Sequence, residues 1–107
     1  MNTELVSPDT AIAHCVTMTF KDSVGQHQID ELCAFLEGMR TSVPGLIDLH
    51  YGPDLGRHPM AADFLHFAVF QSTAALELFE QGAFQKELMA RFGPSMIASA
   101  TIAEIAV

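Results

Sequence analysis

The most regular hydrophobic pattern in the chain is an alternation in residues 11–20, AIAHCVTMTF. In a β-strand, successive side chains point to opposite faces of the sheet. One face of this stretch would then carry Ile12, His14, Val16, Met18 and Phe20. That face is large and apolar, and His14 is its one polar member. The pattern therefore predicts a strand that faces the core and brings a histidine into it.

A spacing of three or four residues between apolar positions follows the first strand and predicts an amphipathic helix. Ser23 is expected to cap this helix, with Gln26 reaching back in a capping box. Pro44 and Gly45 are expected to end it, because proline cannot continue a helix and glycine turns without steric cost. The apolar stripe consists of Ile29, Leu32, Cys33, Leu36, Met39 and Val43.

A second helical pattern begins after Phe70. Ser72 or Thr73 is expected to cap it, Gly82 to interrupt it, and Gly93 with Pro94 to stop it. Its stripe consists of Ala75, Leu78, Phe79, Phe84, Leu88 and Phe92. The sequence thus predicts two helical segments, the second of them broken.

Three further stretches predict strands. Residues 46–51 mix apolar and polar side chains, as is typical of a strand near a sheet edge. Residues 62–70 are apolar on both faces, as in a central strand. Residues 96–107 are small, β-branched and largely apolar. The longest predicted loop, residues 52–61, holds two glycines and two prolines and is a candidate lid or rim for a pocket.

The predicted order is strand, helix, strand, strand, helix, strand. This order is typical of the α+β class, as a ferredoxin-like βαββαβ fold with two helices over one face of a four-stranded antiparallel sheet. The other sheet face would be left open although it is apolar, so we expect a second copy to cover it in a two-fold homodimer. We expect an N-terminal arm at residues 1–10 and a single domain at residues 11–107.

Composition narrows the possible partners. The formal net charge of −8 repels phosphate backbones and anionic lipid, which argues against nucleic acid and membranes as partners. The first ten residues lack the basic and apolar regions of a signal peptide, so we expect a soluble, cytoplasmic protein. The two cysteines and five histidines do not recur at metal-ligand spacing, so neither a metal nor another cofactor is expected.

Two histidines are the candidates for chemistry. The first and third strands are neighbours at the centre of this topology, so His14 and His66 can reach one cavity if both point toward the helices. Each could instead be a buried neutral histidine with a structural hydrogen bond. Asp48 with His50 could form a dyad or an edge-strand ion pair, and His58 in the long loop could touch a ligand or be solvated.

The chain resembles the stress-responsive A/B barrel (Dabb) family. The resemblance rests on the order of several short motifs: residues 14–21 (HCVTMTFK), Pro44-Gly45, residues 52–55 (GPDL), residues 64–70 and the closing strand. It covers residues 11–107 and implies a dimeric α+β barrel. Most members of the family have no assigned reaction.

A plant polyketide cyclase of that family uses histidines and tyrosines in a pocket between sheet and helices. Its first-strand histidine matches His14, whereas its third-strand histidine falls on Phe64, with His66 one pleat further along. The positions of its remaining histidine and two tyrosines match Gln85, Leu36 and Phe79. The resemblance thus implies a pocket lined by His14, Phe64, His66, Phe79, Phe84 and Gln85 with few acid–base groups.

Two functions of different classes remain open from the sequence. The first is a homodimeric protein that binds a small apolar or aromatic molecule in a pocket between sheet and helices. The second is a cofactor-independent enzyme, similar to a polyketide cyclase or a monooxygenase, with His14 as general base and His66 as a second catalytic candidate.

Overall fold

The computed structural model describes residues 8–107, so most of the arm predicted at residues 1–10 lies outside the described residues. The elements are β1 (Ile12–Phe20), α1 (Gln26–Glu37), α2 (Met39–Ser42), β2 (Leu46–Pro53), β3 (Phe64–Phe70), α3 (Thr73–Gln81), α4 (Ala83–Met96) and β4 (Ile97–Ala106). This order agrees with the pattern of strands and helices read from the sequence.

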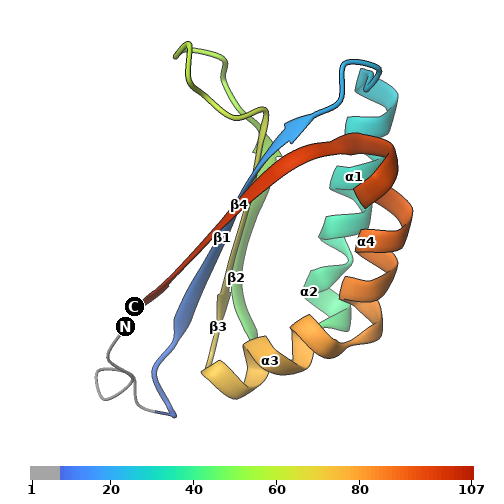
Figure 1. Ribbon diagram of the computed structural model, residues 1–107. Coiled ribbons are helices and arrows are strands. Elements are labelled where there is room, and N and C mark those ends of the chain that lie inside the picture. The colour runs from blue at the N-terminus through green and yellow to red at the C-terminus, as the bar shows by residue number, and fades with distance from the viewer. Residues whose placement is uncertain (1–7) are drawn as a thin grey trace.

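The four strands form one antiparallel sheet in the order β2-β3-β1-β4, and all the helices lie on one side of it (Figure 1). The prediction of an α+β, ferredoxin-like fold is confirmed. The sheet is open, with β2 and β4 as its edges, so one chain does not close a barrel by itself.

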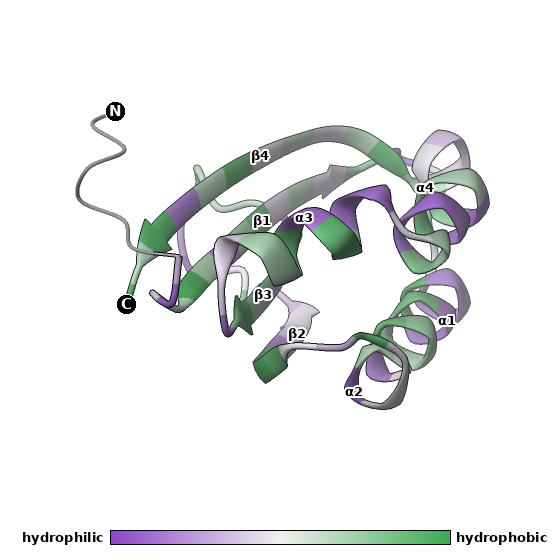
Figure 2. Ribbon diagram, turned by 90° about the horizontal axis from the view of Figure 1, so that it is seen from below, coloured by the Kyte–Doolittle hydropathy of each residue, from purple (hydrophilic) through white to green (hydrophobic). Residues whose placement is uncertain are grey.

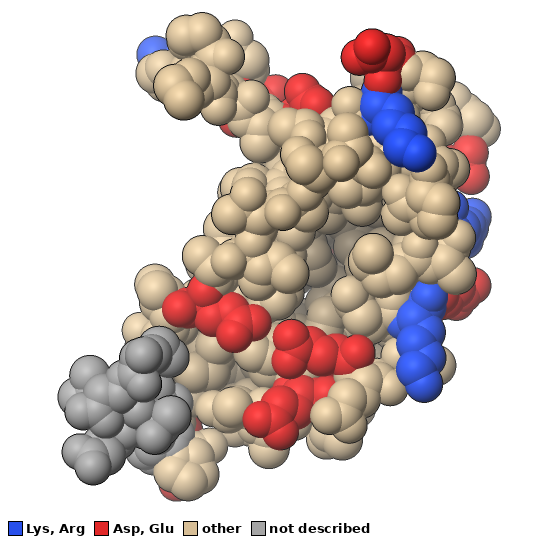
Figure 3. Space-filling view, in the orientation of Figure 1, with Lys and Arg blue, Asp and Glu red and all other residues tan. Residues whose placement is uncertain are grey.

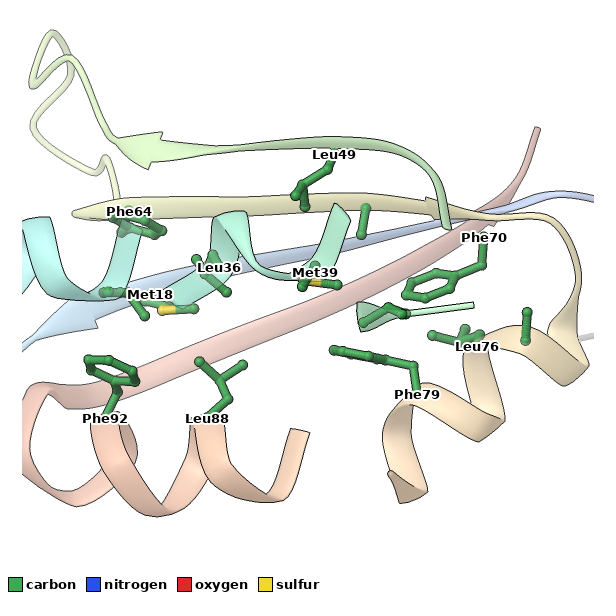
Figure 4. Close-up of a cluster of buried hydrophobic side chains, with 14 of the residues drawn as sticks. Met18, Leu36, Met39, Leu49, Phe64, Phe70, Leu76, Phe79, Leu88 and Phe92 are labelled. Carbon is green, nitrogen blue, oxygen red and sulfur yellow. The ribbon is translucent and has the colours of Figure 1, made fainter. Parts of the chain in front are cut away.

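The main core lies between the sheet and the helices. Figure 4 shows Phe64, Phe70 and Leu49 on the sheet side facing Leu36, Leu88 and Phe92 on the helices. The largest side chains with almost no exposed surface are Phe64, Phe70, Leu32, Leu36, Met39, Leu49 and Met96. Burying such side chains stabilises each by about 1.5–3 kcal/mol relative to exposure, which explains why the alternation of residues 11–20 directs one face toward the helices.

The first helix begins two residues later than the sequence predicted. Gly25 is its N-cap, and the Gln28 side chain accepts a hydrogen bond from the Gly25 backbone N–H at 2.9 Å. The expectation that Ser23 caps the helix is therefore wrong, because the side-chain contact to the N-cap backbone forms two residues further along, between Gln28 and Gly25. The helix also breaks at Gly38, after which Met39 begins the short α2 with its side chain fully buried.

The prediction that Gly93 and Pro94 stop the last helix is also wrong, since α4 continues through Pro94 to Met96. Lys21, at the end of β1, caps the last turn. Its backbone N–H donates to the Met96 carbonyl at 2.8 Å, and its ammonium donates to the Pro94 carbonyl. These bonds satisfy carbonyls at the helix end from a segment distant in sequence, which local punctuation could not reveal.

Two local features shape the connection between the helices and β2. Gly45 has φ +83°, and a β-carbon there would lie 2.6 Å from the Ala75 side chain, so only glycine fits this close approach to α3. A register shift between Leu46 and Asp48 then places Leu46 against the core while Ile47 is exposed. Strict alternation along this strand would put Ile47 on the same face as Leu49, and the irregular pairing explains why it does not.

The second helical segment agrees with prediction at its start and its interruption. Ser72 is the N-cap of α3, and its hydroxyl accepts a hydrogen bond from the Ala75 backbone N–H at 3.1 Å. Gly82 ends α3 and caps α4. None of the helices in the described residues is long and apolar enough to cross a membrane.

The side of the sheet away from the helices carries a mixture of apolar and small polar side chains. Cys15, Thr17 and Phe67 lie on it, and Ile105 adds an exposed apolar side chain from β4. Figure 2 shows apolar and polar residues intermixed along the strands and the helices gathered on one side of the sheet. No other element of the described residues 8–107 covers this face.

Candidate functional site

A cavity of about 160 Å³ lies between the helix-facing side of the sheet and the helices α3 and α4. Figure 3 shows the corresponding hollow in the surface, with acidic side chains beside it. Its lining residues are His14, Val16, Met18, Leu32, His66, Phe79, Glu80, Gln85, Leu88, Met89, Phe92, Ile97, Ala100 and Ile102. The walls are mostly apolar. The mouth lies at β4, where Ile102 remains 62% exposed because no helix covers that edge strand.

His14 forms a close pair with Glu104. The two residues are opposite one another on β1 and β4, and His14 Nδ1 lies 2.6 Å from Glu104 Oε2. An ionised carboxylate only accepts hydrogen bonds, so Nδ1 carries the proton of this contact. His14 is buried, whereas the Glu104 side chain is 38% exposed. The Glu104 carboxylate, which does not itself line the cavity, thus holds the buried imidazole from the solvent side.

His66 has a different environment on the neighbouring strand. Its Nε2 lies 3.2 Å from the Met39 sulfur, which can only accept, so Nε2 carries the proton here. Burial lowers the pKa of His66 to about 4, and the nearby His14 adds to this shift. His66 is therefore neutral near pH 7, with Nδ1 as its accepting nitrogen.

The structure brings together four of the six pocket residues expected from the sequence. His14, His66, Phe79 and Gln85 all line the cavity. Phe64 is fully buried in the core, and Phe84 stacks on Phe35 with ring centroids 4.6 Å apart, so neither is in the lining. A binding or catalytic role for any of these residues stays a prediction.

The other candidates lie away from the cavity. His50 Nε2 and Asp48 Oδ2 are 3.2 Å apart, but both side chains are more than half exposed. Tyr51 on the same strand donates a hydrogen bond to Glu37, which raises the pKa of the tyrosine and lowers that of the glutamate. This contact ties β2 to α1 and leaves Tyr51 outside the site.

The long loop does not contribute to the cavity. It runs between β2 and β3 and projects to the side of the sheet away from the helices (Figure 1). His58 and Arg57 are exposed on it, and no residue of positions 54–63 lines the cavity. The position of the loop therefore does not support a role as a lid over this cavity.

Sequence reasoning missed two acidic residues at the mouth. Glu80 comes from the end of α3 and Glu104 from β4, and their carboxylates lie with a ring nitrogen of His14 within 4.8 Å of one another. Glu104 is the one charged residue in the last strand, and this could have marked it. Glu104 pairs with His14 because of the register between β1 and β4, and Glu80 comes close to them because of how α3 packs on the sheet. Neither arrangement can be read from the local sequence pattern.

This arrangement has a clear chemical character. A neutral imidazole with a carboxylate on its other nitrogen can accept a proton or a hydrogen bond, and the apolar walls exclude water from a bound molecule. The sheet, the helices over one face and the cavity between them define a ferredoxin-like α+β domain with a site that opens at β4.

The family follows from the sequence comparison. Residues 12–107 match the model of the stress responsive A/B barrel domain, and the chain belongs to this Dabb family. No curated protein sequence matches the chain.

Solved structures with the same fold include proteins with and without a stated activity. A dimeric ferredoxin-like protein of unknown function from Thermobifida fusca has a TM-score of 0.83 at 20% identity, with 92% of each chain covered. Hydroxynitrile lyase from Passiflora edulis has a TM-score of 0.81 at 20% identity, covering 94% of this chain and 95% of that one. A Dabb family protein from Mesorhizobium loti has a TM-score of 0.75 at 11% identity, with coverage of 90% and 95%. These likenesses support the fold.

Proposed function

We propose that the protein is a homodimer in which each chain binds a small apolar or aromatic molecule between its sheet and its helices. The observation that supports this proposal is the cavity of about 160 Å³, whose mostly apolar lining includes two histidines, His14 and His66, on adjacent strands. Small-molecule sites are typically concave and apolar with a few polar groups that orient the ligand. The cavity is small, so a ligand of one or two rings suits it better than a large one.

The two histidines offer similar polar contacts to such a ligand. The hydrogen bonds at His14 Nδ1 and His66 Nε2 leave one accepting nitrogen on each ring. A hydroxyl or amino group on an otherwise apolar molecule could donate to either nitrogen. Aromatic contact with Phe79 or Phe92 would add to the burial of the ligand body.

Dimerisation is proposed through the sheet face that the helices leave open. That face presents Phe67, Leu65 and Ile105 among small polar side chains, and the dimeric ferredoxin-like protein from Thermobifida fusca shares this fold. In a two-fold homodimer, the open faces of the two sheets would pack together and bury these side chains. Leu55 and Met60, exposed on the projecting loop, lie on a segment that extends to the same side.

A second candidate function is cofactor-independent acid–base catalysis with His14 as the base. The observation that favours it is the 2.6 Å contact between His14 Nδ1 and Glu104, which leaves Nε2 as the nitrogen that can accept a proton and stabilises the imidazolium formed when it does. Hydroxynitrile cleavage, the activity named for the Passiflora relative, begins with removal of a hydroxyl proton. Polyketide cyclisation and quinol oxidation need the same kind of base.

Isothermal titration calorimetry with 2-naphthylmethanol tests binding. This probe is neutral, and its two rings suit the size and the apolar lining of the cavity. The Ala100→Phe variant should abolish binding, because Ala100 lines the cavity from the exposed edge strand and a larger side chain would fill it. Ala90→Phe, on the exposed side of α4 outside the lining, is the matched control and should bind like the wild type. Equal binding by both variants would contradict the cavity as the site.

Catalysis is tested by turnover of mandelonitrile, of aromatic polyketides and of quinols, with His14→Ala and His66→Ala variants. Activity that falls at least ~100-fold in His14→Ala while the probe still binds would support the enzymatic function. Binding without turnover of any substrate would support the binding function alone.

A further inference from the structure

Two acidic side chains lie at the mouth of the cavity, Glu80 in its lining and Glu104 beside the lining, against His14. His14 comes from β1, Glu80 from the end of α3 and Glu104 from β4, and their donor and acceptor atoms lie within 4.8 Å of one another. Both residues are exposed, and Glu104 is the one paired with the histidine. The mouth is thus an acidic rim on an apolar chamber.

No basic side chain neutralises this rim within the described residues. The lining contains no lysine or arginine, and the ion pairs of Arg40 and Arg91 are with Glu37 and Glu31, on other parts of the molecule. Lys21 is bound to the end of α4. The chain also has a formal net charge of −8, so its long-range field attracts cations and repels anions.

We propose that the ligand is an apolar amine, whose hydrophobic body fills the cavity and whose protonated amino group lies between Glu80 and Glu104. This inference rests on the proposed binding function and names the chemical class of its ligand. An ammonium has three donors and no acceptor, which complements two carboxylates. Leu88, Met89 and Phe92 then surround the body of the ligand.

The hydrogen bond between His14 and Glu104 suits an ammonium better than a metal ion. A zinc ion with ligands at about 2.1 Å requires donor atoms roughly 3.4 Å apart. To bind both residues through these atoms it would have to separate His14 Nδ1 from Glu104 Oε2, now 2.6 Å apart, and displace their shared proton. An ammonium leaves that hydrogen bond in place, because Glu104 has a second oxygen.

The test compares three probes with one ring system and different charge: 2-naphthylmethylamine, 2-naphthylmethanol and 2-naphthoate. Titration calorimetry at pH 7 and low salt should give an affinity for the amine at least ~10-fold higher than for the alcohol, with the acid binding more weakly than either. The preference for the amine should shrink as salt is added, because the carboxylates are partly exposed.

Charge-removing variants locate the effect. Glu80→Gln and Glu104→Gln should each lower the affinity for the amine by ~3-fold to ~10-fold and leave that for the alcohol within ~2-fold. Glu87→Gln makes the same charge change on α4 outside the cavity lining and should alter neither affinity.

The outcomes separate this inference from the function on which it rests. If the alcohol binds as tightly as the amine, the cavity binds small molecules but the inference is wrong. Tighter binding of the acid would also overturn it, as would micromolar binding of Zn²⁺ alone that is lost in both His14→Asn and Glu80→Gln while the amine shows no preference. If no probe binds, the proposed binding function itself fails.

Discussion

The two faces of the sheet lie in different surroundings. The face toward the helices buries Phe64, Phe70 and Leu49 almost completely, whereas Phe67 and Leu65 on the opposite face retain part of their surface to solvent. Neighbouring residues of the same strand, β3, supply both sets. The comparison shows that the helices of one chain cover only one of the two faces of its sheet. Both candidate histidines lie on that covered face.

The largest expected effect lies on the covered face. Phe64→Ala should lower the free energy of unfolding by about 3–5 kcal/mol, because it opens a cavity in a fully buried part of the core. Urea denaturation measures this loss. Ile102→Ala, on the exposed edge strand, should cost less than about 0.5 kcal/mol. Similar losses for both variants would mean that the two sites are equally buried in solution.

The buried His66 should make stability depend on pH. Its folded pKa of about 4 lies below the ordinary value of 6.5, so the unfolded chain takes up a proton between these values that the folded chain does not. Stability is fully present above pH 6.5 and is lost as the pH falls toward 4, by up to about 3 kcal/mol from this group.

Urea denaturation of the wild type and of His66→Gln at pH 7 and pH 4.5 isolates that contribution. The variant should lose less stability over the same interval, because the remaining titrating groups are common to both proteins. Equal losses in the two proteins would show that His66 is solvated or already protonated in the folded state.

The open face should govern association more than folding. Phe67→Glu places a charge on that face and should raise the dimer dissociation constant by about 10-fold to 100-fold. Sedimentation velocity over a range of protein concentrations measures the change, and circular dichroism should show an unaltered fold. A wild-type protein that is monomeric at micromolar concentration would contradict the proposed interface.

The smallest expected effect is on the His14 pair. Glu104→Gln should lower the free energy of unfolding by less than about 1 kcal/mol, because the carboxylate is more than one third exposed and its attraction to His14 is screened. Thermal unfolding measures this change. A loss of several kcal/mol would indicate a structural rather than a functional pairing.

Local sequence signals predicted the parts of the fold that depend on nearby residues. The alternation in residues 11–20 predicts the strand and its buried face, and the Ser72 cap is the one observed. The same signals were wrong at Ser23 and at Pro94. At Pro94 the carbonyls are satisfied by Lys21, more than seventy positions earlier in the chain, so a local stop signal was overridden by a tertiary contact.

The sequence by itself determined the order of strands and helices and the side of its strand on which His14 lies, because alternation and helical spacing are properties of consecutive residues. Only the tertiary structure decided that His66 also points toward the helices, that Glu104 faces His14, that Glu80 lies near both, and that Phe64 and Phe84 are outside the cavity lining. Those facts depend on strand register and helix packing, which join residues far apart in the chain and leave no periodic trace in it.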